Sequence, residues 1–212
     1  DKYLGDAPVW EKSQKLLEEI LVENKIDYYR AVGEAAIYGP KMDLISKDSL
    51  GREWQLSTIQ LDFIMPQRFG LSYIDESGKQ KTPVMVHRAI IGSPERFMGI
   101  LIEHYAGSFP LWLSPVQVKI VSVGESHAEF CLKLADEFKQ NEIRIEVDGS
   151  DQTVGNKIRI AAAEKVPYIL VIGDREMASD KLAVRDRGEK ITREISKEEF
   201  IKEVRDKIRQ RK

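Results

Sequence analysis

The fold of the first half of this 212-residue chain is decided by residues 84–101, Val84-Met85-Val86-His87-Arg88-Ala89-Ile90-Ile91-Gly92-Ser93-Pro94-Glu95-Arg96-Phe97-Met98-Gly99-Ile100-Leu101. The first eight of these residues are rich in β-branched side chains, which predicts a buried strand over 84–91. Gly92 breaks the strand, Ser93 suits a helix N-cap, and Pro94 suits the first helical position. Apolar residues from Phe97 to Leu101 then recur at helical spacing, so we expect a helix directly after the strand.

Two side chains of this stretch are unusual for packing alone. His87 lies inside an apolar strand, and Arg96 lies in the first turn of the expected helix. A cation at that end opposes the helix dipole, which favours anions there, so a bound phosphate would explain Arg96. The alternative is a hydrogen-bonded core histidine and an arginine paired with a nearby acid. Taken alone, the two residues favour this structural alternative.

Composition limits the class of protein. Hydrophobic residues make up 42% of the chain, enough for one large or two small domains, and no apolar run is long enough to span a membrane. The single cysteine, Cys131, excludes an internal disulfide and a multi-cysteine zinc module, and it indicates a reducing, cytoplasmic setting. The net charge of −2 gives no general attraction to DNA or RNA, so any RNA must bind at a shaped local site. Because the chain begins at Asp1 without methionine, we expect a fragment or a processed product.

The remaining pattern predicts two domains, over 1–113 and 114–212. In the first we expect a helix that opens near Asp6, strands over 26–30, 42–46, 53–63 and 71–74, a hairpin turn at 47–52 and a loop over 66–70. In the second we expect strands over 116–123, 143–147, 166–172 and 182–187, which alternate with helices over 126–140, 154–164 and from Ser196 onward. This alternation predicts an α/β domain with mostly parallel strands and 166–172 at its centre.

The strand expected over 53–63 carries two glutamines. Strict alternation places Gln55 and Gln60 on opposite faces of the sheet unless a β-bulge intervenes. The structural alternative is that both are ordinary polar groups on a sheet.

The run His87-Arg88-Ala89, followed by Gly92-Ser93-x-Glu95-Arg96-Phe97-x-Gly99-Ile100-Leu101, resembles the third signature motif of class II aminoacyl-tRNA synthetases. Three more stretches, in the family's order, are similar to its threonyl members: Tyr38-Gly39-Pro40-Lys41; Trp54-Gln55-Leu56 with Thr58-Ile59-Gln60-Leu61-Asp62-Phe63; and Phe109-Pro110-Leu111-Trp112-Leu113-Ser114-Pro115-Val116-Gln117-Val118. The resemblance runs from about Trp10 to the C-terminus. It implies the end of a class II catalytic domain over 1–113, an antiparallel sheet with helices, followed by an α/β anticodon-binding domain with a mixed, mostly parallel sheet over 114–212.

The resemblance also implies an activity and its site residues. The parent would be a homodimeric threonine–tRNA ligase that uses ATP with Mg, threonine and the threonine tRNA. Arg96 would be catalytic and contact the ATP phosphates, which a planar guanidinium binds two oxygens at a time. The matched positions around the threonine and ATP pocket are Tyr38, Lys41, Gln55, Gln60 and Ser93. The structural alternatives are a plain turn at 38–40 and a solvated cation at Lys41.

The same resemblance implies a zinc ion held by one cysteine and two histidines. His87 would be the last of these three ligands. Zinc would bind the amino and hydroxyl groups of threonine, and a site built for a hydroxyl rejects valine. The other candidates, His104, His127 and Cys131, match no ligand position. Since a catalytic zinc normally has three protein ligands, we expect an incomplete site in this chain.

In the second domain, Arg159, Glu176 and Arg185 match positions that read the anticodon. An arginine can pair with a base edge or stack on an unpaired base, and a glutamate can accept from a base amino group. The alternative for each is a solvated surface charge. Asp151 stands where many members have asparagine, and its carboxylate repels phosphate.

The first and second signature motifs of class II synthetases are missing, so we expect no threonine activation by this chain alone. Two other functions stay open. The chain could be an RNA-binding module without catalysis, or a paralogue that acts with a partner chain. Prolyl, histidyl and glycyl relatives share the general plan, but His87 and the 38–41 run favour the threonyl type.

Overall fold

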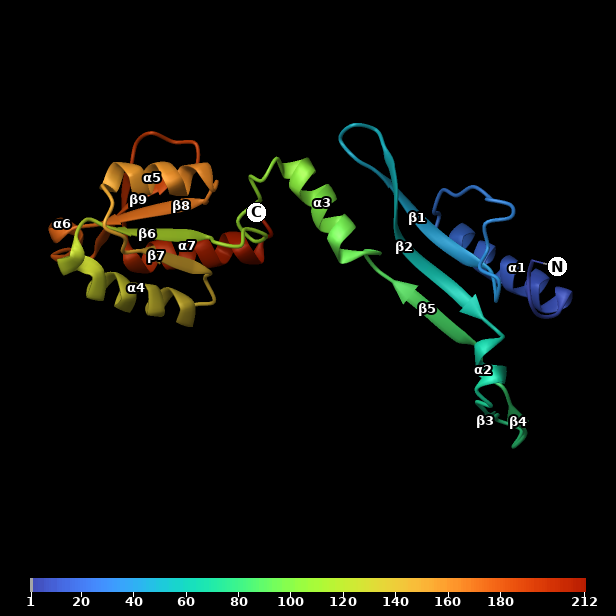
Figure 1. Ribbon diagram of the computed structural model, residues 1–212. Helices are drawn as coiled ribbons and strands as arrows, with labels where there is room; N and C mark the ends of the chain where they lie inside the picture. Colours follow the sequence, from blue (N-terminus) through green and yellow to red (C-terminus); the bar gives the residue numbers. More distant parts are fainter. Residues whose placement is uncertain (1) are drawn as a thin grey trace. The chain divides into compact units, whose positions relative to one another are not determined.

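The computed structural model describes residues 2–212 and divides them into two compact units, between His104 and Tyr105. Each unit has its own sheet (Figure 1). The boundary expected after residue 113 lies between this division and the first strand of the second unit, and it stays a prediction. None of the helices in the described range has the length and apolar content that a membrane span needs.

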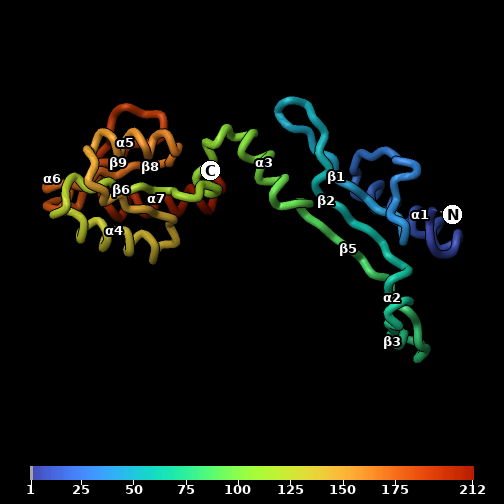
Figure 2. Tube along the Cα trace, viewed as in Figure 1, coloured from blue at the N-terminus to red at the C-terminus, as the bar shows by residue number. Residues whose placement is uncertain are grey.

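The first unit is built on a three-stranded antiparallel sheet of order β1-β2-β5. Its elements are α1 (Ala7–Glu23), β1 (Lys41–Lys47), β2 (Glu53–Asp62), α2 (Met65–Arg68), β3 (Tyr73–Ile74), β4 (Gln80–Lys81), β5 (Met85–Ala89) and α3 (Pro94–Tyr105). Figure 2 shows the course of the β1–β2 hairpin. Its turn is closed by Asp48, whose backbone amide donates to the carbonyl of Arg52 at 3.0 Å. The hairpin, both long strands and the strand-to-helix passage at 92–94 confirm the sequence prediction.

Three expectations for this unit are wrong. Residues 26–30 form no strand, because their backbone has no partner strand in the described chain, and Tyr29 is 73% exposed. Residues 65–68 form the short helix α2 instead of a loop, since Pro66 suits a first helical turn. β5 is shorter than expected and is not buried. Its residues alternate between half-buried and exposed, with Val86 at 58%. A β-branched composition predicts a strand, but it does not reveal whether both faces are covered.

The second unit is an α/β domain whose sheet has the order β10-β9-β8-β6-β7. Its elements are β6 (Val118–Ser122), α4 (Ala128–Gln140), β7 (Ile145–Asp148), α5 (Val154–Ala163), β8 (Tyr168–Ile172), α6 (Asp174–Met177), β9 (Lys181–Asp186), β10 (Arg193–Ser196) and α7 (Lys197–Arg209). β6 is parallel to β7 and β8, while β9 is antiparallel to both β8 and β10. Only β9 therefore runs against the other strands of this sheet, which confirms a mixed, mostly parallel arrangement. α6 and β10 were not predicted.

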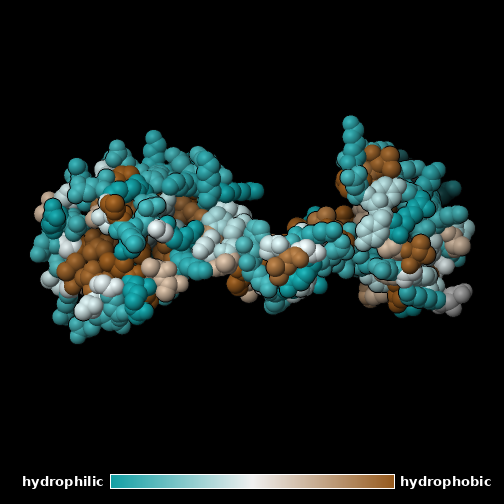
Figure 3. All heavy atoms as spheres, turned by 90° about the horizontal axis from the view of Figure 1, so that it is seen from above, coloured by the Kyte–Doolittle hydropathy of each residue, from teal (hydrophilic) through white to brown (hydrophobic). Residues whose placement is uncertain are grey.

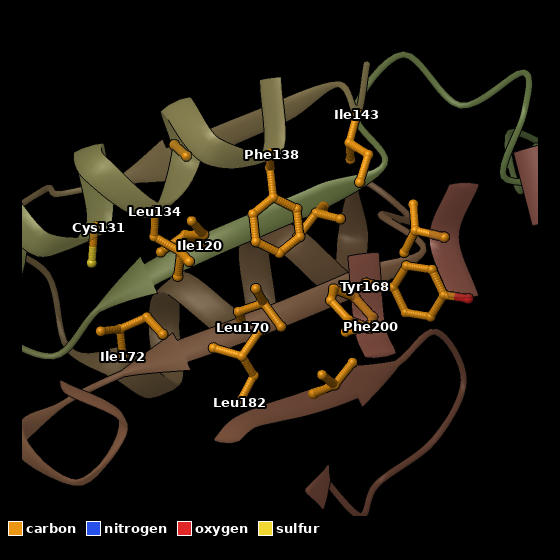
Figure 4. Packing of buried hydrophobic residues seen from close by; sticks show 14 of the residues in the cluster. Ile120, Cys131, Leu134, Phe138, Ile143, Tyr168, Leu170, Ile172, Leu182 and Phe200 are labelled. Atoms are coloured by element: carbon orange, nitrogen blue, oxygen red, sulfur yellow. The ribbon is translucent and has the colours of Figure 1, made fainter. Parts of the chain in front are cut away.

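The core of the second unit lies on both faces of the sheet. Helices α4 and α7 cover one face, where Phe138 and Phe200 pack with Ile120 and Leu170 (Figure 4). α5 covers the other face, with Ala161 against β6 and β8. β8 is buried almost throughout, as a central strand covered on both faces should be.

The first unit has much less of a core. Among the described residues, 22 of the 26 exposed large hydrophobic side chains belong to it. On the one face that Figure 3 shows, brown hydrophobic residues lie on both units. Exposed apolar surface of this extent is typical of a face that another part of a protein covers.

Candidate functional site

The antiparallel register places three predicted site residues in one row across the first sheet. Lys41 of β1 pairs with Gln60 of β2, and Gln60 pairs with His87 of β5. Residues that lie directly opposite one another share a face of the sheet. The side chains of all three therefore lie on the same face, which we call the site face.

A β-bulge brings Gln55 to the site face as well. Leu44 pairs with Ser57 and Ile45 with Gln55, so Leu56 is left over in β2. Ile45 lies four residues after Lys41 on β1 and thus on the same face, as does its partner Gln55. The sequence predicted opposite faces for the two glutamines unless a β-bulge lay between them. The structure contains that bulge, so Gln55 and Gln60 share a face.

Tyr38 joins the row from the turn before β1. Its hydroxyl donates a hydrogen bond to Oε1 of Gln60, and its ring centroid lies 5.6 Å from that of His87. Gly39 permits this approach, because a Cβ there would lie 1.8 Å from the carbonyl oxygen of Leu61. The run 38–40 is therefore more than a plain turn.

Lys41 is not a solvated cation. Its ammonium group donates to Oδ2 of Asp43, and both side chains are largely buried. Asp43 faces Thr58 across β1 and β2, so it shares the site face. Sequence reasoning missed Asp43. The signal was present in the i, i+2 spacing from Lys41, which places both side chains on one face of a strand.

His87 is anchored by a buried carboxylate. Its Nε2 lies 2.9 Å from Oδ2 of Asp62, which is 0% exposed, while the His87 side chain is 41% exposed and so is no core histidine. Oδ1 of Asp62 accepts from the backbone amides of Ile64 and Met65, each at 2.9 Å. Burial raises the pKa of Asp62, but the hydrogen bonds from His87 and the two amides outweigh it, so the pKa of Asp62 is lowered. Sequence reasoning missed Asp62, although an acid between Leu61 and Phe63 marks it.

Ser93 and Arg96 organise the start of α3. The Ser93 hydroxyl accepts from the backbone amide of Arg96 at 3.3 Å and donates to Oε2 of Glu95 at 2.7 Å, which lowers the pKa of Glu95. Nη2 of Arg96 donates to the backbone carbonyl of Gln55 at 2.6 Å. Arg96 thus contacts the bulge of β2, and among the described residues it forms no ion pair with an acid.

The described residues do not form a zinc site by themselves. None of their side chains gather into a group of three or more His, Cys, Asp or Glu that could hold a metal ion. His87 and Asp62 supply two groups that bind each other. Cys131 is fully buried in the second unit, where burial raises the pKa of its thiol.

Each of the three predicted anticodon-reading side chains forms its own local hydrogen bond. The Arg159 guanidinium on α5 donates to Oδ1 of Asn156 at 2.8 Å, and Oε2 of Glu176 in α6 accepts from the Gly173 amide at 3.0 Å. Nε of Arg185 on β9 donates to the Glu189 carbonyl at 3.0 Å. Each side chain therefore has a defined position. Their role in reading the anticodon stays a prediction.

The turn before α5 caps this helix through one side chain. Thr153 is the N-cap, and its hydroxyl accepts from the Asn156 amide at 3.4 Å. Asp151 is exposed. Lys157, which the sequence did not single out, is only 2% exposed.

Comparison with known proteins agrees with this architecture. The family model for the tRNA synthetase class II core domain (G, H, P, S and T) matches residues 6–105, and the model for the anticodon binding domain matches residues 117–207. The chain is 47% identical to the threonine–tRNA ligase of Desulforamulus reducens over 208 residues, 98% of this chain, and 48% identical to that of Petrotoga mobilis over 211 residues. The chain belongs to the threonyl-tRNA synthetase family.

The chain spans about a third of the length of these curated threonyl-tRNA synthetases, 33% in both cases. Among solved structures it is similar to the RNA binding domain of threonyl-tRNA synthetase from Cryptosporidium parvum Iowa II, with a TM-score of 0.85 and 34% identity. That match covers 96% of this chain and 52% of the other. The predicted family and fold class are thereby confirmed: an antiparallel sheet of the class II core, followed by an α/β anticodon-binding domain.

Proposed function

We propose that this chain serves a threonine–tRNA ligase by contributing the third signature motif to the aminoacylation site and by reading the anticodon of threonine tRNA. By itself it does not activate threonine. The observation that carries the proposal is the row of Lys41, Gln60 and His87 on the site face, with Tyr38 bound to Gln60.

The site face offers the chemistry that an amino acid needs. Tyr38 and Gln60 carry hydroxyl and amide groups that can accept from an ammonium or exchange a hydrogen bond with a hydroxyl. Gln55 lies on the same face, toward Arg96. The Arg96 guanidinium donates one Nη2 hydrogen to the Gln55 carbonyl. Its remaining N–H donors suit the phosphates of ATP, which would bind together with Mg.

Zinc is not assigned to this chain. The resemblance gives a ligand position to His87, and the described residues hold no group of three or more His, Cys, Asp or Glu that could bind a metal ion. One imidazole is too few for tight binding. A zinc-dependent parent would need further donors, so no step of the proposed function depends on the metal here.

The second unit supports the RNA half of the proposal. Arg159 and Arg185 supply cations, and Glu176 supplies an acceptor, at positions that local hydrogen bonds hold. Rigid charged groups suit the recognition of splayed, single-stranded bases. The proposal also includes homodimerisation, which the family resemblance implies, and a cytoplasmic location, which the single cysteine indicates.

Titration with RNA tests the recognition. The chain is titrated with a threonine tRNA transcript and with the same transcript altered in its anticodon, at one fixed salt concentration. We expect weaker binding of the altered transcript, and loss of the difference in Arg185→Ala. The exposed arginine near the end of α7 gives the matched control, Arg209→Ala, which should keep the difference. Equal affinity for both transcripts overturns the anticodon-reading role.

Catalysis is tested separately by threonine-dependent pyrophosphate exchange. We expect no exchange above background from this chain alone. Exchange above background that Arg96→Ala abolishes would overturn the proposal that the chain is inactive alone.

A further inference from the structure

Asp62 is the most completely buried carboxylate near the site face, and both of its oxygens have partners. Ionised carboxylates are costly to bury unless donors surround them. Asp62 receives two backbone N–H groups on Oδ1, from Ile64 and Met65, and faces the His87 ring with Oδ2. Oδ1 is thus occupied as an acceptor by two amides and Oδ2 is directed at a ring nitrogen, an arrangement that suits an ionised carboxylate, which only accepts hydrogen bonds.

An acceptor of this kind determines which imidazole nitrogen of His87 carries the proton. With Nε2 at 2.9 Å from Oδ2, the hydrogen must lie on Nε2. A neutral imidazole then has its lone pair on Nδ1. In the described part of the chain Nε2 is the ring nitrogen that has a partner, so Nδ1 stays available at a ring that is 41% exposed.

We propose that Asp62 is a positioning residue that holds His87 in the Nε2–H tautomer and presents Nδ1 as an electron-pair donor on the site face. The ring orientation fits this role, because Asp62 holds one edge of the imidazole and the Tyr38 ring lies beside it, with centroids 5.6 Å apart. Gln60, which pairs directly with His87, places its amide in the same row. The donor atom would face the amino-acid part of the substrate. That last step rests on the proposed function, whereas the tautomer does not.

The rigidity of Asp62 follows from its place at the end of β2. Asp62 accepts hydrogen bonds from two backbone amides in the turn that leads into α2. One carboxylate therefore links the end of β2, the start of α2 and the imidazole of His87 on β5. A carboxylate or carbonyl that binds the second nitrogen of a histidine is the usual means by which proteins set a tautomer.

The test is nitrogen NMR of the full chain labelled at the histidine imidazoles, recorded at about pH 8, where an ordinary imidazole is neutral. The chain has three histidines, and His87→Gln assigns the His87 signals by their loss. We expect wild-type His87 to be almost entirely in the Nε2–H form. Asp62→Asn keeps an Oδ1 acceptor for the two amides but turns the group that faces His87 into a donor. It should therefore convert His87 to the Nδ1–H form, as asparagine does to a histidine that aspartate normally orients.

The matched control is Asp43→Asn, which changes the other largely buried carboxylate of the site face and should leave the His87 tautomer unchanged. A wild-type spectrum with mainly Nδ1–H, or with comparable amounts of both forms, overturns the proposal even if Asp62→Asn fails to fold. An unchanged Nε2–H form in folded Asp62→Asn overturns it as well. Neither result depends on RNA binding or on pyrophosphate exchange, so failure of this proposal is distinct from failure of the proposed function.

Discussion

Gln55 and Gln60 lie on the same face of β2, although they are five positions apart and regular alternation would put them on opposite faces. The reason is the unpaired Leu56, which resets the alternation between the two glutamines. The same bulge turns the Gln55 carbonyl toward α3, where Nη2 of Arg96 donates to it at 2.6 Å. A single extra residue thus places both glutamines on the site face and ties the arginine of the third motif to their strand.

The contact between Arg96 and the bulge requires a glycine at position 92, so replacing Gly92 should disturb that contact. The residue has φ +67°, and an added Cβ would lie 2.7 Å from the Leu56 carbonyl oxygen and 3.1 Å from Nη2 of Arg96. We expect Gly92→Ala to lower the free energy of unfolding of the first unit by about 1–3 kcal/mol, through backbone strain and the displaced carbonyl. Denaturant unfolding followed by tryptophan fluorescence measures this change.

The control for Gly92→Ala is Gly99→Ala in the middle of α3. A Cβ at Gly99 meets nothing, so alanine there should stabilise the helix by roughly 0.5–1 kcal/mol. Equal effects of the two substitutions would contradict the close approach of Gly92 to the bulge.

Local chemistry made residues 84–105 predictable, because a β-branched run, a glycine break, a serine cap and an early proline all act within a few residues of one another. The bulge at Leu56 was not predictable in the same way, since it is defined by pairing with β1. The sequence also showed Asp62 as an acid in an apolar run, yet its burial depends on the turn into α2 and on His87, which lies 25 residues away. The false strand at 26–30 has the same cause, because strand propensity does not supply a partner strand.

Gly39 should be as intolerant of a side chain as Gly92. A Cβ at Gly39 would lie 1.8 Å from the Leu61 carbonyl, which is backbone and cannot swing aside. We expect Gly39→Ala to push the 38–40 turn away from β2 and to break the Tyr38–Gln60 hydrogen bond. NMR shifts of the Tyr38 ring and the Gln60 amide measure this displacement. Unchanged shifts in the folded variant would show that the turn does not need glycine.

Lys157 joins three elements of the second unit from a buried position. Its ammonium donates to the Ser122 carbonyl at 3.0 Å, to the Ser122 hydroxyl at 3.3 Å and to the Asp148 carbonyl at 3.4 Å, so α5 is held to the ends of β6 and β7. Lys157→Met keeps the length of the side chain but leaves these acceptors without their donor. We expect the second unit to lose about 1–3 kcal/mol of stability, the usual cost of unsatisfied buried polar groups.

Trp112 reports on this change, because it is the tryptophan of the second unit, once Trp10 and Trp54 are replaced by phenylalanine. Lys133→Met is the control, since Lys133 is exposed on α4 and pairs with Glu129 across one helical turn. Such a pair contributes less than about 1 kcal/mol. A Lys157→Met variant as stable as the control would mean that the buried charge costs as much as its hydrogen bonds contribute.

Glu203 should make the second unit sensitive to acid. Burial raises its pKa, but hydrogen bonds from Lys207 at 2.7 Å and from Arg193 at 2.9 Å outweigh burial and lower the pKa below that of a free glutamate. The folded state therefore binds this proton less tightly than the unfolded state. The resulting stability is fully present above the unfolded pKa of about 4.3, and it is lost as the pH falls through that value toward the lower folded pKa.

Glu203→Gln removes the titrating group, so it separates this contribution from that of other carboxylates. We expect the free energy of unfolding of the wild-type second unit to fall more steeply below about pH 5 than that of the variant, with the two curves converging in strong acid. Glu198→Gln in the first turn of α7 is the control and should follow the wild-type curve, since Glu198 is exposed. Parallel curves for wild type and Glu203→Gln would show that the Arg193 and Lys207 contacts do not favour the ionised form of Glu203.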